Sequence, residues 1–125
     1  MLWVWLWICA AVHGLFMLAE LLPWSFPKAL ALASAPVLKA APFAPVQKDL
    51  VAAVVHNAGV YNAILTGGFV WAAVLWSGHR VEPAAELARV LFTGAAVAGA
   101  FGSVTLKSKP AAGQALLGIA GLFFI

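Results

Sequence analysis

The side chains that could do chemistry in this sequence are ionisable groups set within long apolar stretches. His13 and Glu20 lie seven residues apart in the first of these stretches. At 100° per residue, this spacing returns to nearly the same helix face, about 10 Å along the axis. A charged side chain inside a bilayer costs at least about 2.5 kcal/mol, so such a group points to a function. His13 and Glu20 are therefore the candidates for a catalytic acid or base, or for a proton-carrying pair.

A second polar group follows in the apolar stretch after residue 50. Asn57 and Tyr61 are one helical turn apart on one face, while His56 and Asn62 are displaced around the same helix. A helix that is polar on several sides is poorly suited to face lipid. This helix is therefore predicted to lie centrally, packed by the others.

Depth along the helices predicts that these groups form one layer. Counting 1.5 Å per residue from boundaries near Pro23 and Asp49 puts Tyr61 and Asn62 about level with His13. Gln114, in the last apolar stretch, falls on the same side of the membrane. The predicted ligand-binding set is His13, Glu20, His56, Asn57, Tyr61, Asn62 and Gln114.

For any single amide the simpler interpretation is structural. Asn57, Asn62 or Gln114 could join helices through a hydrogen bond worth roughly 0.6 kcal/mol. Glu20, close to the predicted membrane boundary, could reach water. The shared layer of histidine, carboxylate and amide groups is what favours a pocket.

The composition identifies the class of protein. Of 125 residues, 65% are hydrophobic and 9% are charged, and the mean hydropathy is +1.02. A soluble domain has no core large enough to hide so much apolar surface. A spanning helix needs about 20 apolar residues, so this length allows four or five spans in one domain.

Prolines and short polar turns divide the chain into an all-α, polytopic bundle of four transmembrane helices. We expect one transmembrane domain over 1–125, and an interfacial loop over 23–49 containing a short amphipathic helix near Lys28 to Lys39. In the third stretch, two lines of small residues predict close helix packing. These lines are Gly94, Ala98 and Gly102, and Ala95, Gly99 and Ser103. The four spans are predicted over residues 2–22, 50–76, 84–105 and 111–125.

The charges predict orientation. The formal charge is +3, but the basic residues are scattered singly, which argues against a nucleic-acid partner. Most of them lie in two segments, 23–49 and 106–110, which the positive-inside rule places in the cytoplasm, with both termini outside. We expect a multi-pass membrane protein. The single cysteine, Cys9, excludes a disulfide framework and a Cys-based metal motif.

Several motifs together resemble a known family. His13 and Glu20 are followed by His-Asn-Ala-Gly-Val-Tyr-Asn at 56–62, by Val-Ala-Gly-Ala-Phe-Gly-Ser-Val-Thr at 97–105, and by Gln114 in a late helix. The chain resembles the DUF1304 family of short bacterial integral membrane proteins, which are uncharacterised. Ala58 stands where that family has Gln in its N-Q-G-x-Y-N motif. The resemblance implies the fold, the polar layer and a place in the bacterial inner membrane, but no reaction.

Three functional hypotheses stay open at this point. The first is a component that binds a small or lipophilic molecule, including one for proton-coupled transport through His13 and Glu20. The second is an intramembrane enzyme of isomerase or cyclase type acting on a lipophilic substrate. The third is a structural or accessory subunit whose polar groups set helix register.

Cofactors and partners are less defined by the sequence. No cofactor and no metal site is expected, because two histidines on neighbouring helices are weak evidence for haem or metal through His13, His56 and Glu20. Membrane lipid is the expected partner, together with a homo-oligomer or a larger membrane complex.

Overall fold

The computed structural model describes residues 1–22, 45–105 and 107–125, and their side chains apart from 45–51. Within these residues the chain forms four α-helices and no strand, so the all-α prediction is confirmed. The helices are α1 (Leu2–Leu21), α4 (Pro45–Ser77), α5 (Val81–Thr105) and α6 (Lys109–Leu122). The amphipathic helix expected near Lys28 to Lys39 lies outside the described residues.

Three of the helices are long and apolar enough to cross a membrane, over Leu2–Leu21, Ala52–Ser77 and Val81–Thr105. The chain is therefore a membrane protein. α6 has 14 residues, which correspond to roughly 21 Å, short of a hydrocarbon core of about 30 Å. A membrane crossing by α6 stays a prediction.

The start of α4 differs from the sequence prediction. α4 begins at Pro45, whereas the predicted loop continued to residue 49. Proline is well tolerated at the first position of a helix, where its missing N–H has no intrahelical partner to lose. The helix has 33 residues, or roughly 50 Å, which exceeds the thickness of a hydrocarbon core.

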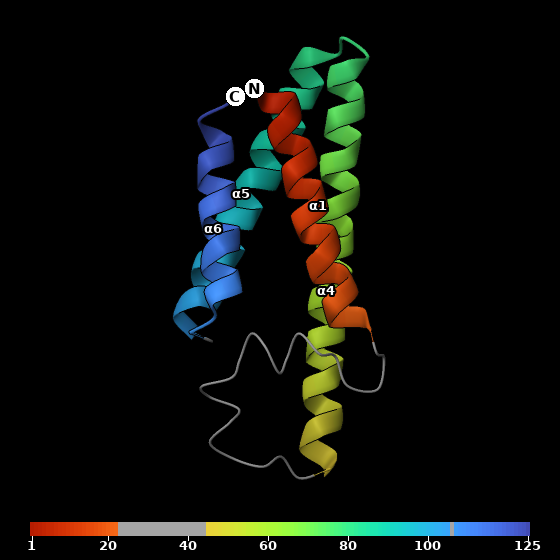
Figure 1. Ribbon diagram of the computed structural model, residues 1–125, viewed down its shortest axis with the longest axis vertical. Helices are drawn as coiled ribbons and strands as arrows, with labels where there is room; N and C mark the ends of the chain where they lie inside the picture. The colour runs from red at the N-terminus through yellow and green to blue at the C-terminus, as the bar shows by residue number, and fades with distance from the viewer. Residues whose placement is uncertain (23–44, 106) are drawn as a thin grey trace.

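The helices pack as two antiparallel pairs (Figure 1). α1 lies along α4, and α5 lies along α6, whereas α1 and α6 share only a small contact. The α5–α6 pair is close because glycines lie at its crossing: a Cβ on Gly118 would be 2.6 Å from the Phe92 carbonyl oxygen. Among the small residues predicted to pack closely in α5, Ala95 and Gly99 are buried, while Gly94 is exposed.

The turn between α4 and α5 is a Schellman motif. The Arg80 N–H donates to the Leu75 carbonyl at 2.9 Å, and the His79 N–H donates to the Trp76 carbonyl at 3.1 Å. His79 has a φ of 59°, the left-handed conformation that glycine usually supplies in this motif. The turn brings α5 back antiparallel to α4.

The apolar core occupies one half of the bundle, the end where the two termini lie beside each other (Figure 1). Its centre is an aromatic contact between Phe69 of α4 and Phe92 of α5, whose ring centroids are 5.2 Å apart. Trp5 closes this end by donating to the Leu117 carbonyl of α6 at 3.2 Å. The polar side chains of α1 and α4 begin where this core ends.

Candidate functional site

The register of α1 against α4 determines which polar groups meet. Near one end, the Trp3 indole N–H donates to the Ser77 hydroxyl at 2.8 Å. Midway, a Cβ on Gly14 would lie 3.7 Å from the Thr66 methyl group. Tyr61 and Asn62 are therefore level with Glu20, and the prediction that they are level with His13 is wrong. The cause is that α4 continues well beyond the end of α1 (Figure 1), so the beginning of α4 is not level with the end of α1.

The polar half of the bundle is the half that contains the His13–Gln114 and Glu20–Asn62 contacts. His13 lies where this half meets the apolar core, and it is completely buried. Its Nδ1 is 2.8 Å from the Cys9 carbonyl oxygen, and its Nε2 is 3.4 Å from the Gln114 amide nitrogen on α6. A carbonyl can only accept, so Nδ1 carries the proton, and Nε2 of the neutral ring then accepts from Gln114. The ring also packs on Phe69, with centroids 5.3 Å apart. His13 and Gln114, predicted to share a site, are in contact.

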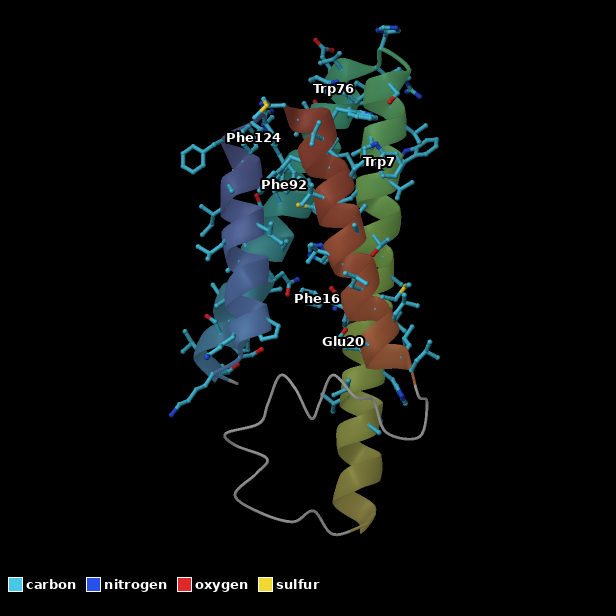
Figure 2. The ribbon with its side chains drawn as sticks, in the orientation of Figure 1. Trp7, Phe16, Glu20, Trp76, Phe92 and Phe124 are labelled. Carbon is cyan, nitrogen blue, oxygen red and sulfur yellow. The ribbon has the colours of Figure 1, made fainter. Side chains whose placement is uncertain are left out.

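Glu20 lies two turns further along α1, near its lower end (Figure 2). The Asn62 amide nitrogen on α4 donates to Glu20 Oε2 at 2.6 Å. The Asn62 side chain is only 7% exposed, and its Oδ1 has no hydrogen-bond partner among the described residues. Glu20 and Asn62 therefore form a second contact, which contains one buried and unsatisfied oxygen.

Two residues that support this contact were missed at the sequence level. Thr66, one turn beyond Asn62, donates its hydroxyl to the Asn62 backbone carbonyl at 2.8 Å. Gly59 lies against α1, where an added Cβ would be 2.9 Å from Leu21 Cγ and 3.1 Å from Glu20 Cβ. Both share the Asn62 face of α4 at helical spacing, which is the signal that could have identified them.

The other predicted residues of α4 lie apart from this pair. His56 is buried, but it precedes Asn62 by six residues, roughly 9 Å along the axis and beyond the end of α1. Asn57 is exposed, and Tyr61 is 62% exposed, on the outer face of α4. The predicted ligand-binding set thus divides into two parts. Asn57 and Tyr61 are exposed on α4, and the other predicted residues are buried or half-buried on α1, α4 and α6.

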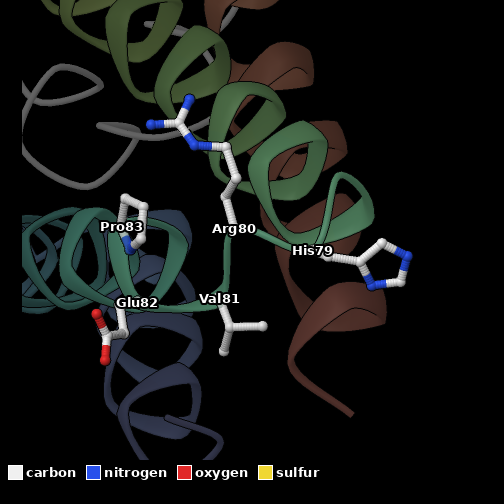
Figure 3. Close-up of a pocket in the computed structure, with 5 residues that line it drawn as sticks. All are labelled: His79, Arg80, Val81, Glu82 and Pro83. Carbon is white, nitrogen blue, oxygen red and sulfur yellow. The ribbon is translucent and has the colours of Figure 1, made fainter.

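The arrangement does not bring His13, His56 and Glu20 together as one set of metal ligands. Among residues whose side chains are described, no group of three or more His, Cys, Asp or Glu is placed to hold a metal ion. A surface hollow does exist elsewhere, at the α4–α5 turn, lined by residues 79–83 (Figure 3). It lies beyond the C-terminal end of α4, whereas Asn62 is near the middle of that helix, and it contains none of the predicted site residues.

Fold and site together define an all-α membrane protein with one apolar half and one polar half. The chain belongs to the DUF1304 family: the family described as "Protein of unknown function (DUF1304)" matches residues 7–125, and the resemblance seen in the motifs is confirmed. No curated protein and no solved structure matches the chain. The family description assigns no activity, so function has to be argued from the site.

Proposed function

We propose that this protein binds a small or lipophilic molecule in the polar half of its bundle, beside α1, α4 and α6. The observation that supports this most is Asn62, a side chain 7% exposed whose Oδ1 has no partner among the described residues. Buried polar atoms almost always have a hydrogen-bond partner. A bound molecule with a hydrogen-bond donor would complete this site.

The finer form of the proposal is a component of proton-coupled transport. Two titratable side chains, His13 and Glu20, lie on one face of α1, and each contacts an amide from another helix. Gln114 and Asn62 thereby connect α1 to α6 and to α4. A proton held at Glu20 would change the charge beside the ligand, which is how protonation is coupled to binding in transporters.

We also propose the inner membrane of a bacterial cell, with residues 23–49 and 106–110 on the cytoplasmic side. Basic residues support this orientation, because they are concentrated in these two segments. They are Lys28, Lys39, Lys48, Lys107 and Lys109.

Native mass spectrometry of the detergent-purified protein tests the binding proposal. We expect a defined extra mass on the wild type, with occupancy reduced at least tenfold in Asn62→Leu. Asn57→Leu is the matched control, because it makes the same change on the exposed face of α4 and should keep the extra mass. Far-UV circular dichroism would verify that both variants are folded.

Other outcomes separate the remaining hypotheses. Bare masses in the wild type and both variants, even after incubation with a total lipid extract, would contradict ligand binding and favour the accessory subunit. A bound molecule that is converted during incubation, with conversion lost in Glu20→Gln, would favour the intramembrane enzyme.

A further inference from the structure

The oxygen atoms left without a hydrogen-bond partner around Asn62 are acceptors. The Asn62 amide nitrogen already donates to Glu20 Oε2, and the Thr66 hydroxyl already donates to a backbone carbonyl. Besides the second N–H of that amide, what remains is Asn62 Oδ1, which is buried without a partner among the described residues, and the second oxygen of the Glu20 carboxyl group. A molecule that binds these oxygens must bring donors rather than acceptors.

Glu20 also lacks a positive partner within the described part of the chain. Its one polar contact there is the neutral amide of Asn62. Arg80 and Arg89 belong to the α4–α5 turn and the first half of α5, at the other end of the bundle (Figure 1). Lys107 and Lys109, at the α5–α6 turn, are exposed, and neither forms an ion pair with Glu20 among the described residues. An ionised carboxylate in a partly buried position is stable only when a positive charge or several donors compensate it.

The depth of the pair indicates an amphiphilic molecule. Glu20 is the penultimate residue of α1, so the Glu20–Asn62 contact lies near the end of an apolar helix of 20 residues, which spans roughly 30 Å. That is the boundary between hydrocarbon and headgroups. A polar group bound there would have its apolar chain beside the bundle.

Building on the proposed binding function, we propose that the Glu20–Asn62 pair binds the protonated primary amine of an amphiphile. An ammonium group has three N–H donors and no acceptor, which suits the two free acceptor oxygens, one of which belongs to the uncompensated Glu20 carboxylate. Hydrogen bonds between charged partners are about twice as strong as neutral ones. The amine belongs either to the headgroup of an ethanolamine lipid or to a free lipophilic amine.

Binding to protein in phosphatidylcholine nanodiscs tests this proposal with four probes of equal chain length: decylamine, decyltrimethylammonium, decanol and decanoate. For each probe, binding to the Asn62→Leu variant is subtracted from binding to the wild type. This difference, called Asn62-dependent binding, excludes probe that only partitions into the lipid. We expect this binding to be at least tenfold tighter for decylamine than for decyltrimethylammonium, which has charge but no N–H donor. Glu20→Gln, which preserves the shape of the side chain and removes its charge, should weaken decylamine binding about tenfold. Asn57→Leu should not weaken it.

A second arm identifies the source of the amine. Native mass spectra of protein from mixed ethanolamine and choline lipid nanodiscs would show selective retention of the ethanolamine lipid if the headgroup binds. Decylamine binding without such retention would support a free amine. Both results support an amine site.

The results that overturn the amine differ from those that overturn binding. Asn62-dependent binding of decanoate or decyltrimethylammonium as tight as that of decylamine would contradict the amine and leave the binding function standing. No Asn62-dependent binding of any probe, with bare masses in the native spectrum, would contradict both.

Discussion

His13 and Asn62 are both buried polar side chains, but their environments differ. Both ring nitrogens of His13 have a polar neighbour, Cys9 on its own helix and Gln114 on α6. Asn62 uses its amide nitrogen and leaves its carbonyl oxygen without a partner among the described residues. His13 is therefore suited to join α1 and α6, and Asn62 is suited to receive a ligand.

The tautomer of His13 follows from its contacts. We expect a neutral ring with the proton on Nδ1, because the Cys9 carbonyl 2.8 Å away can only accept. Nitrogen-15 NMR of histidine-labelled protein in lipid would measure this, with His13→Gln identifying the signal. Exposed His79 provides a solvent-exchanging reference. A signal from an Nε2-protonated ring would show that His13 lacks the contact with Cys9.

At the scale of elements, the contact between α5 and α6 depends on glycine. Gly118 of α6 lies so close to α5 that an added Cβ would be 2.6 Å from the Phe92 carbonyl oxygen and 3.0 Å from Ala96 Cα. Backbone atoms cannot move aside as a flexible side chain can. Small residues thus allow two helices to pack closely in a solvent where apolar burial gives no driving force.

Gly118→Ala should therefore lower the free energy of unfolding by about 1–3 kcal/mol, the usual effect of overpacking. Gly113→Ala is the matched control in the same helix, because no atom outside its neighbourhood lies within 4 Å of the added Cβ. It should be neutral or stabilise by up to about 1 kcal/mol through helix propensity. Unfolding by dodecyl sulfate in mixed micelles, followed by circular dichroism, measures both. Equal effects of the two substitutions would contradict the close packing.

At the scale of the whole molecule, the two helix pairs make a bundle with unlike halves. Apolar and aromatic side chains hold the pairs together near the termini, and polar contacts occupy the other half. In Figure 2, Phe92 and Phe124 lie toward one end of the bundle and Glu20 lies toward the other. α1 and α6 share only a small contact, so the Gln114–His13 contact is one of few links between them.

The orientation predicted by the basic residues can be measured with an impermeant maleimide on intact cells or spheroplasts. We expect His79→Cys to be labelled from outside and Lys107→Cys to be labelled only after lysis, because α5, which lies between them, is long and apolar enough to cross a membrane. Native Cys9 is buried and should stay unlabelled in the parent protein. The reverse pattern would contradict the proposed orientation, and labelling of both sites from outside would contradict the crossing by α5.

Local properties of the sequence were enough to predict the helices and the relation of His13 to Glu20. Long apolar runs, prolines and short polar turns act within a few residues, so four helices could be predicted from them. Seven residues are two turns of any α-helix, so His13 and Glu20 share a face regardless of neighbours. The beginning of α4 was less predictable, because proline is compatible with both a loop and a first helical turn.

The sequence by itself thus determined an all-α membrane protein and a group of polar side chains within it. Only the tertiary structure decided which of them meet. The rotation and register of α4 depend on contacts with α1 at Gly14, Thr66 and Trp3, and these contacts couple residues far apart in the chain. They turn Asn62 inward to Glu20 and leave Tyr61 on the outer face, although the two residues are adjacent in sequence. Neighbouring residues on a helix point about 100° apart, so a small rotation of the helix about its axis decides which one is buried.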